Sequence, residues 1–447
     1  MSPGDLPLPE IRADWLRQRA ALVDQTTTLP ALPAVLEEVR HQTETGHHMG
    51  LIYFDLSSEA RLESIYGWET YDSLLRQVGE ALEVFRRDRL QTGDLLAIYG
   101  IRAEEFLLFL RIETVRGAEQ RLEDLRDRVI DHLSAKLRVQ FDNESPRPLS
   151  VQSGSTLLRA DPMVRFERVV YRALDDLRSV CRRQREKQHT ERLRELRRIV
   201  TAADITVRFQ PIVDLRDGAV HGFEALSCGP PGGVFENPEM LFAFAEETDH
   251  IVELERICRF ESIRRAGQLG GGQKLFINSS ARGFADPELF CRSLVEQAER
   301  CGLEPSDIVI EITERVAITA WQEFRRSVAA LRLIGFQIAI DDMGAGYSSL
   351  QSVAEVQPDY LKVDLSLIRD LHKSAIKRSL LDGLVGIART IGAKVIAEGV
   401  EQEEEYQALR GMNIAFAQGF YFARPNTELR RTPVQLPPAV RAEPPAP

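Results

Sequence analysis

Two adjacent carboxylates, Asp341 and Asp342, end a short apolar run at residues 336–340 that has the composition of a buried strand. Gly344 and Gly346 follow at once and allow the backbone to turn tightly. Adjacent acids repel each other, and burying them is costly unless a cation compensates their charge. The pair is therefore either a solvated Asp-Asp turn or a divalent-metal site at the carboxyl end of a strand.

The same pattern, a short apolar run that ends at a polar residue, recurs after about residue 205. Amphipathic stretches separate most of the runs, and alternating strands and helices predict parallel βα units. With residues 336–340 there are eight runs, which predicts a TIM-like (β/α)8 barrel with its active site at the carboxyl ends of the strands. The other runs and their polar residues are Thr206–Phe209 with Gln210, Val220–Ala225 with Glu224, Leu275–Ile277 with Asn278, Ile308–Ile310 with Glu311, Tyr360–Leu361 with Lys362, Val395–Ala397 with Glu398 and Phe416–Ala417 with Gln418.

Composition limits the function classes. The 447 residues suffice for two domains, and the net charge of −11 argues against a nucleic-acid binder, which needs a basic face. The five scattered cysteines form no CxxC pair and are expected to be free thiols in a reducing compartment. With no apolar run of membrane-spanning length and no signal peptide, a cytoplasmic protein without a membrane partner is expected. The candidate metal ligands are carboxylate and amide oxygens, which favour a hard cation.

The chain is predicted to have five segments. Residues 1–30 form an N-terminal segment, 31–162 a smaller α/β sandwich domain, 163–203 a charged helical linker, 204–425 the barrel and 426–447 a disordered Pro-rich tail. The linker is predicted to be a solvated connecting helix, and the alternative is a signalling helix that couples the domains through a dimer seam. The sandwich is predicted from the strand Leu51–Phe54, the helix Tyr71–Phe85, the hairpin of Leu95–Tyr99 with Glu105–Leu110 and the strand Leu149–Val151.

The sandwich domain resembles a degenerate GGDEF (diguanylate cyclase) domain. Asp55 stands where that family has a metal-site aspartate, and Glu63 stands where it has an asparagine that contacts guanine. The signature loop at residues 100–106 carries Arg and Ala at two glycine positions, or else an insertion. If the insertion is allowed, the product-site motif falls at residues 91–94 and has lost its arginine. Glycines let the backbone approach a phosphate, so their loss predicts no cyclase activity. A structural or dimerising role is favoured over a residual nucleotide site.

The barrel resembles the EAL-domain family of cyclic di-GMP phosphodiesterases over essentially its whole length, which implies that one strand runs antiparallel to the rest. A lone Glu-Ala-Leu would be uninformative, whereas an ordered set of motifs is specific. The matching segments are Gln210–Val213, Glu224–Leu226, Glu311–Glu314, Asp341–Gly344 with Gly346–Leu350, Leu361–Asp364, Ala397–Glu401 and Gln418–Phe420.

The resemblance implies a role for each site residue. Lys362 would orient water or the developing charge, Glu398 would also assist deprotonation, and Gln418 would position water or a metal-bound group. Glu314 and Glu401 would hold the ligands and the loop after Asp342. Gln210 and Leu226 would touch the nucleotide. Two Mg²⁺ or Mn²⁺ ions are implied, one held by Glu224, Asn278, Glu311 and Asp341, and the other by Asp341, Asp342 and Glu398.

One position departs from the family. Cys228 stands where an arginine usually contacts the substrate. Losing a charge-assisted hydrogen bond costs about 1.5–3 kcal/mol, or about one to two orders of magnitude in substrate affinity. The predicted function is hydrolysis of cyclic di-GMP to linear pGpG by a homodimer. The alternatives are a receptor that binds cyclic di-GMP without turnover and a scaffold for protein signalling partners, and clustered carboxylates argue against the scaffold.

Overall fold

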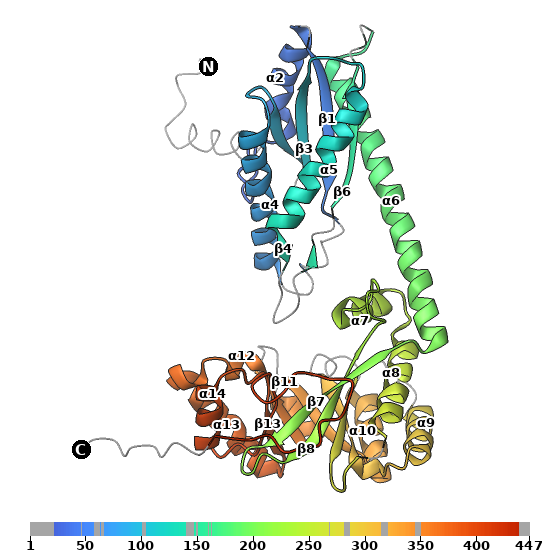
Figure 1. Cartoon of the computed structure of the whole chain (residues 1–447), viewed down its shortest axis with the longest axis vertical. Helices are drawn as coiled ribbons and strands as arrows, with labels where there is room; N and C mark the ends of the chain where they lie inside the picture. The colour runs from blue at the N-terminus through green and yellow to red at the C-terminus, as the bar shows by residue number, and fades with distance from the viewer. Residues whose placement is uncertain are drawn as a thin grey trace, which may run out of the picture. The chain divides into compact units, whose positions relative to one another are not determined.

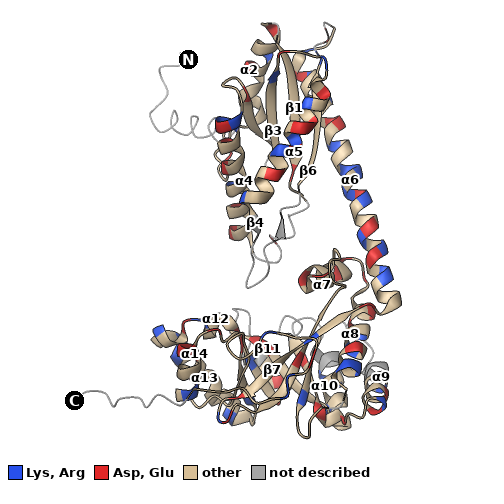
Figure 2. Ribbon diagram, in the orientation of Figure 1, with Lys and Arg blue, Asp and Glu red and all other residues tan. Residues whose placement is uncertain are grey.

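The computed structural model describes residues 22–45, 47–57, 63, 67–100, 104–139, 147–148, 151–159, 161, 163–267, 269–280, 287–313, 321–344 and 350–437. The chain divides into two compact units at residues 191 and 192, within the long helix α6 (Phe166–Ala202). Acidic and basic side chains alternate along the exposed length of α6 (Figure 2). None of the helices in these ranges has the length and apolarity that crossing a membrane requires.

The first unit is a small α/β region around a four-stranded antiparallel sheet (Figure 1). The strands, in sheet order, are β2 (Leu95–Tyr99), β3 (Glu105–Ile112), β1 (His48–Asp55) and β6 (Gln152–Leu158). The predicted hairpin is confirmed as β2 and β3. The predicted strand at residues 149–151 lies mostly outside the described residues, and the described strand begins at Gln152. A short pair, β4 (Arg138–Val139) and β5 (Arg147–Pro148), forms a separate ribbon.

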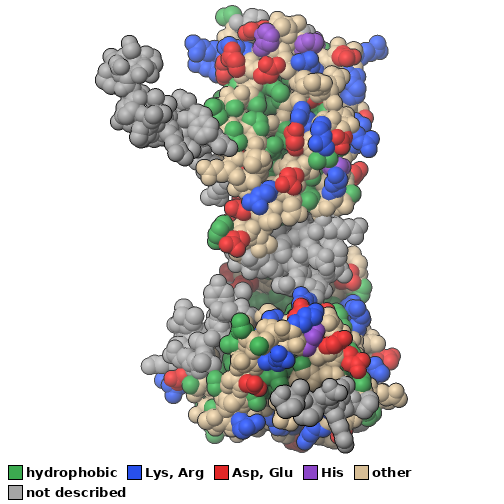
Figure 3. All heavy atoms as spheres, turned by 90° about the vertical axis from the view of Figure 1, so that its left-hand side faces the viewer, with side chains coloured by type: hydrophobic (Ala, Val, Ile, Leu, Met, Phe, Trp, Pro, Cys, Tyr) green, Lys and Arg blue, Asp and Glu red, His purple; other side chains and the backbone are tan. Residues whose placement is uncertain are grey.

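Alternate residues of β1 face opposite sides of this sheet, as the pleat requires. Ile52 and Phe54 pack with helices α4 (Trp68–Arg89) and α5 (Ala118–Lys136). Leu51 and Tyr53 pack on the other side, with α2 (Leu32–Glu44) and the first half of α6. On the face shown in Figure 3, the basic and acidic side chains of the described residues are interspersed.

The second unit is a closed barrel of eight strands, in the order β10-β11-β12-β13-β14-β7-β8-β9. All eight predicted strands are confirmed. β7 pairs antiparallel with both of its neighbours, β8 and β14, and it continues to Asp214 rather than ending at Phe209. The strands are β7 (Thr206–Asp214), β8 (Val220–Cys228), β9 (Lys274–Ser279), β10 (Ile308–Thr313), β11 (Gln337–Met343), β12 (Tyr360–Val363), β13 (Lys394–Ala397) and β14 (Phe416–Ala417).

Helices connect the parallel strands and cover the outside of the barrel (Figure 1). Several begin at side-chain caps: Asn237 accepts from the Met240 N–H, and Ser374 accepts from the Lys377 N–H. The helices are α7 (Pro238–Glu247), α8 (Ile251–Ala266), α9 (Pro287–Arg300), α10 (Trp321–Ile334), α11 (Leu350–Val356), α12 (Leu365–Ile368), α13 (Ala375–Ile391) and α14 (Glu403–Gly411), with 3-10 turns η3 (Pro305–Asp307) and η5 (Leu371–Lys373).

Candidate active site

An apolar layer closes one end of the barrel interior and supports the candidate site. Seven strands contribute one apolar side chain each, and the ring of His221 on β8 stacks on Phe416 with centroids 4.0 Å apart. The His221 imidazole also lies 3.0 Å from the hydroxyl of Tyr360. The apolar members are Ile212, Phe276, Val309, Ala339, Tyr360, Ile396 and Phe416.

Above this layer lies a polar one, and the two layers are related by the strand period. Residues two positions apart point to the same face of a strand, so the residue two positions after each apolar member also points into the barrel. On the antiparallel strand β7 the step runs backwards, from Ile212 to Gln210. Strand β8 has no apolar member in the layer below, and it contributes Glu224, which pairs with Gln210 in the β7–β8 ladder. Every member of this polar layer was predicted from the sequence. They are Gln210, Glu224, Asn278, Glu311, Asp341, Lys362, Glu398 and Gln418.

Lys362 is the centre of the polar layer. Its side chain is 1% exposed, and its ammonium group forms ion pairs with four carboxylates from four strands. The Nζ atom lies 2.7 Å from Glu311 Oε1, 2.7 Å from Glu398 Oε1, 3.1 Å from Asp341 Oδ1 and 3.5 Å from Glu224 Oε2. A buried ammonium group with this many acidic partners is fixed in position, because no other arrangement would satisfy its charge.

A chain of hydrogen bonds among amide side chains also holds Glu224, the farthest of the four carboxylates from Lys362. The amide of Gln418 donates to Gln210 Oε1 at 3.0 Å and also to Glu224 Oε2. The amide of Asn278 donates to Glu224 Oε1 at 3.2 Å, so both oxygens of this carboxylate are held. Gln210 is itself anchored, since its amide donates to the carbonyl of Ala423 at 3.2 Å. These contacts fix the orientation of Glu224.

The protonation of the layer is strongly perturbed. Burial raises the pKa of Glu311 well above its ordinary value, and although Lys362 opposes the shift, the nearby carboxylates of Glu224 and Asp341 add to it. Burial and Asp341 likewise raise the pKa of Glu398 well above the ordinary value. Burial alone would lower the pKa of Lys362, but the surrounding carboxylates raise it well above normal, so this side chain stays charged.

A β-bulge brings the two adjacent aspartates together. The pairing of β11 with β12 shifts register between Ile340 and Met343, and Asp342 has a φ of 59°. In a regular strand, Asp341 and Asp342 would point to opposite faces, whereas a bulge re-aims one side chain. Carboxylate oxygens of Asp341, Asp342 and Glu398 consequently lie within 4.8 Å of one another.

This arrangement is suited to divalent cations. Four carboxylates, from Glu224, Glu311, Asp341 and Glu398, surround the single positive charge of Lys362, and a fifth, that of the exposed Asp342, lies beside two of them. The Oε2 atom of the fully buried Glu311 has no hydrogen-bond partner among the described residues. Carboxylate and amide oxygens are the donors that Mg²⁺ and Mn²⁺ prefer. The donor set and the excess of negative charge therefore fit the predicted metals.

Two residues were predicted to hold the metal ligands and the loop after Asp342. Glu314 lies outside the described residues, as does the part of the loop at residues 345–349. The side chain of Glu401 is exposed just before α14. The sequence did not single out Glu405, which is 1% exposed and accepts the backbone N–H groups of Glu401, Gln402 and Asp370 at 3.0, 3.1 and 3.0 Å. Glu405 thus fixes the loop after Glu398, and its helix-start position made it indistinguishable from an ordinary capping residue.

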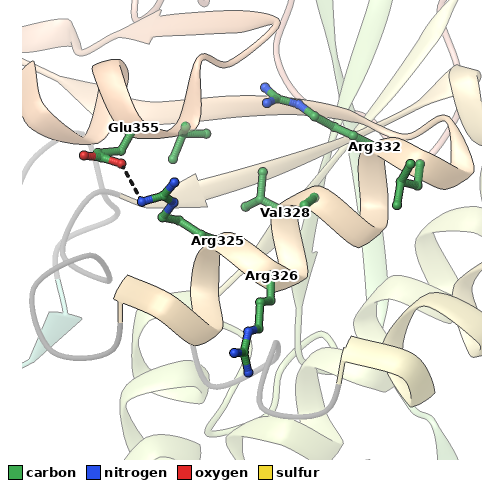
Figure 4. Close-up of a pocket in the computed structure, with 8 residues that line it drawn as sticks. Arg325, Arg326, Val328, Arg332 and Glu355 are labelled. Atoms are coloured by element: carbon green, nitrogen blue, oxygen red, sulfur yellow. Dashed lines mark ion pairs between the residues drawn. The ribbon is translucent and has the colours of Figure 1, made fainter.

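Leu226 lines a cavity of about 390 Å³ beside the polar layer. Asn278 lines it too, and Phe242 and Pro238 contribute apolar walls. Cys228, two residues beyond Leu226, is buried, and its thiol lies 3.5 Å from the carbonyl of Thr206 within the β7–β8 pair. A second hollow, outside the barrel between α10 and α11, has no lining residue from the polar layer, and its ion pair joins Arg325 and Glu355 (Figure 4).

In the first unit, the carboxylate of Asp55 is neutralised by an arginine side chain. The carboxylate is 2% exposed, and its Oδ2 lies 3.2 Å from Nη2 of Arg185 on α6. Its Oδ1 accepts from the N–H and hydroxyl of Ser57 at 2.9 and 2.6 Å. Asp94, the surviving member of the degenerate product-site motif, accepts the backbone N–H groups of Gln91 and Arg111. Both aspartates therefore have structural partners.

The chain is similar in sequence to proteins whose names refer to cyclic di-GMP. Cyclic di-GMP phosphodiesterase PdeR of Escherichia coli (strain K12) is 28% identical over 435 residues, covering 93% of this chain and 63% of that protein. The bifunctional diguanylate cyclase/cyclic di-GMP phosphodiesterase MucR of Pseudomonas aeruginosa is 27% identical over 421 residues, covering 91% of this chain and 60% of that protein. The chain thus spans less than two thirds of the length of either relative.

The fold of the second unit is also found in a solved structure. The crystal structure of the EAL domain of Xanthomonas citri FimX in complex with c-diGMP matches 56% of this chain and 100% of that domain, with a TM-score of 0.51 and 20% identity. A family model described as the EAL domain matches residues 193–425, which is more than half of the chain and includes every strand of the barrel. The protein belongs to the EAL domain family.

Proposed function

We propose that the barrel hydrolyses cyclic di-GMP to the linear dinucleotide pGpG. The observation that carries the proposal is the fixed position of Lys362 among four carboxylates, beside the bulge that gathers Asp341, Asp342 and Glu398. Relatives that bear the name cyclic di-GMP phosphodiesterase support the choice of substrate. Family membership alone would not establish activity, because fold does not imply function.

A phosphodiester is anionic and repels hydroxide, so its hydrolysis needs positive charge at the reacting phosphorus. The chemistry that bound Mg²⁺ or Mn²⁺ supplies is neutralisation of the phosphoryl oxygens, a lower pKa for the attacking water and stabilisation of the leaving alkoxide. Glu224, Asn278, Glu311 and Asp341 would hold one ion, and Asp341, Asp342 and Glu398 would hold the second.

The remaining site residues orient the reactants. Lys362, held in its charged form, would donate a hydrogen bond to the attacking water or to the developing negative charge. Glu398 would accept a proton from the water. Gln418 and Gln210, linked at 3.0 Å, would position a water or a metal-bound group and the nucleotide, and Leu226 would contact the nucleotide from the neighbouring cavity.

The proposal is tested by incubating the purified full chain with cyclic di-GMP and Mn²⁺ or Mg²⁺ and separating the products by chromatography. We expect linear pGpG from the wild type and none from Glu224→Ala. Glu355→Gln, which removes a surface carboxylate paired with Arg325 at 3.2 Å, is the matched control and should retain full activity. Equal turnover by wild type and Glu224→Ala would show that the site has been assigned wrongly.

A second candidate, a receptor that binds cyclic di-GMP without hydrolysing it, is favoured by Cys228. Its buried thiol, 3.5 Å from the Thr206 carbonyl, cannot supply the charge-assisted hydrogen bond of an arginine. Tight binding of cyclic di-GMP with no linear product in Mn²⁺ or Mg²⁺ would select this reading.

For the first unit we propose a degenerate cyclase domain with a regulatory role and no cyclase activity. The ion pair of Asp55 with Arg185 supports this, since a guanidinium group stands beside the carboxylate that a metal would need. The alignment with MucR, which covers 91% of the chain, supports the relationship. Conversion of GTP to cyclic di-GMP by the full chain would refute the proposal. We also propose a homodimer, which a mass measurement in solution tests.

A further inference from the structure

Helix α8, on the outside of the barrel, contains a buried ion pair one helical turn apart. Arg259 Nη1 lies 3.3 Å from Glu255 Oε2, and the two side chains are 7% and 5% exposed. Burial works against the charge of Arg259 and lowers the pKa of this guanidinium group. A buried pair of this kind adds little net stability, and hydrophobic side chains of similar volume often serve the fold as well. Its presence is therefore better explained by what it contacts.

The pair contacts the carboxyl end of β9, where Asn278 leaves the sheet. The last ladder partner of β9 is Ser279, opposite Ile312, so the N–H of Ser280 lies just beyond the ladder. That N–H donates to Glu255 Oε1 at 3.0 Å. Arg259 Nη1 also lies 3.5 Å from the hydroxyl of Ser279. Both members of the ion pair thus hold the two residues that follow Asn278.

Asn278 in turn contacts the site, with its amide 3.2 Å from Glu224 Oε1. Glu255 and Asn278 line the same cavity of about 390 Å³, together with Leu226. Because Ser280 is two residues from Asn278, an acceptor for the Ser280 N–H fixes the backbone from which the Asn278 side chain projects. Without that acceptor, the strand end would be free to turn Asn278 away from Glu224.

We infer that Glu255 is a positioning residue for the metal site: by accepting the Ser280 N–H it holds Asn278 in place beside Glu224, where its side chain would coordinate a divalent cation. This inference rests on the proposed metal-dependent function. Arg259 neutralises the buried carboxylate and braces Ser279. The role belongs to the hydrogen-bond acceptor at position 255 rather than to the charges, and that distinction can be tested.

Two double variants differ only in the acceptor. Glu255→Gln with Arg259→Met removes both charges but keeps an oxygen for the Ser280 N–H. Glu255→Met with Arg259→Met removes the charges and the acceptor. The matched control is Glu261→Gln, on the same helix, whose carboxylate forms ion pairs with its helical neighbours Arg264 and Arg265 among the described residues. Mn²⁺ affinity of the full chain is measured by calorimetric titration, and melting in EDTA reports folding.

We expect the Gln/Met variant and the control to bind Mn²⁺ like the wild type, and the Met/Met variant to bind it about 10–100-fold more weakly. Raising Mn²⁺ should restore the kcat of the Met/Met variant, because its catalytic groups are intact. Wild-type affinity in a folded Met/Met variant would overturn the inference. If that variant does not fold, Glu255→Asp decides: it keeps the charge but withdraws the carboxylate by one methylene, and unchanged affinity would overturn the inference. A wild type that binds no Mn²⁺ would instead refute the proposed function.

Discussion

Glu311→Gln is expected to stabilise the metal-free barrel while disabling its site. Glu311 is fully buried, and it is one of four carboxylates around the single ammonium group of Lys362. Removing one acid leaves Lys362 with three partners at 2.7–3.5 Å, so the cation is not orphaned. The substitution instead relieves repulsion between carboxylates and the desolvation of a charge, while preserving the shape of the side chain.

The magnitude follows from the burial. Replacing buried charges by neutral groups of similar volume is typically neutral or stabilising by about 1–4 kcal/mol, and we expect about 1–3 kcal/mol here because Lys362 offsets part of the cost. For a domain of this size, that corresponds to a rise in melting temperature of roughly 2–12 °C. Activity and Mn²⁺ affinity should fall by more than about 100-fold, since even residues one shell further from a metal often contribute 10–100-fold.

The pH dependence gives an independent check of the same reasoning. The pKa of Glu311 is raised in the folded protein, so between its unfolded and folded pKa values the folded state binds more protons. This carboxyl therefore destabilises the metal-free fold progressively as pH rises through that window. The stabilising effect of Glu311→Gln should be largest at neutral pH and should vanish below about pH 4, where the unfolded carboxyl is also protonated.

The assay is thermal melting of the full chain in EDTA across this pH range, repeated with added Mn²⁺. Glu355→Gln, the surface control, should change stability by less than about 0.5 kcal/mol at every pH. A melting temperature of metal-free Glu311→Gln below that of the wild type at neutral pH would refute the reasoning, because it would mean that the ionised carboxylate stabilises the barrel through Lys362. If added Mn²⁺ raised the melting temperature of Glu311→Gln as much as that of the wild type, Glu311 would not be a metal ligand.

Three further predictions concern other positions. Burial lowers the pKa of His221 to about 4, so its contribution to stability is complete above about pH 6.5 and is lost as pH falls towards 4. In urea unfolding, the fall in the free energy of unfolding between pH 6.5 and 4 should be smaller for His221→Gln than for the wild type by about 1–3 kcal/mol. Asp342→Asn should keep the fold, since Asn tolerates a φ of 59°, but should weaken Mn²⁺ binding at least about tenfold in calorimetric titration. Arg185→Met should destabilise the first unit by about 1–3 kcal/mol in scanning calorimetry, because it leaves buried Asp55 without its cation; an unchanged melting profile would contradict this.

The barrel was predictable because its strands carry two simple signals. Short apolar runs that alternate with amphipathic segments define the βα units, and a polar residue ends each run. The two-residue period then places Glu311 above Val309 and Lys362 above Tyr360 on the same inward face. Neither inference needs side-chain detail, so both could be made from residue types and spacing. That one strand runs antiparallel came only from the family resemblance, which did not say which strand it is, and the continuation of β7 to Asp214 was not anticipated.

Features that depend on tertiary contacts could not be predicted in this way. The bulge that aims Asp341 and Asp342 at one point arises from the register between β11 and β12, which the local sequence does not specify. Glu405 has the sequence signature of a capping acid, yet its second oxygen accepts the N–H of Asp370, 35 residues away. The ion pair of Glu255 with Arg259 looks like an ordinary helical i,i+4 pair until α8 is packed on β9.

The same layer that makes the barrel a candidate enzyme is also its least favourable part energetically. An apolar layer seals one end of the barrel, so the polar layer has little access to water on that side and each excess carboxylate is costly. Lys362 neutralises only one of the four acids of this layer. If stability alone had shaped this layer, uncharged side chains at some of these positions would serve better. The unbalanced charge is therefore best explained by cations that the folded protein binds, and stability and function should respond in opposite directions to the loss of Glu311.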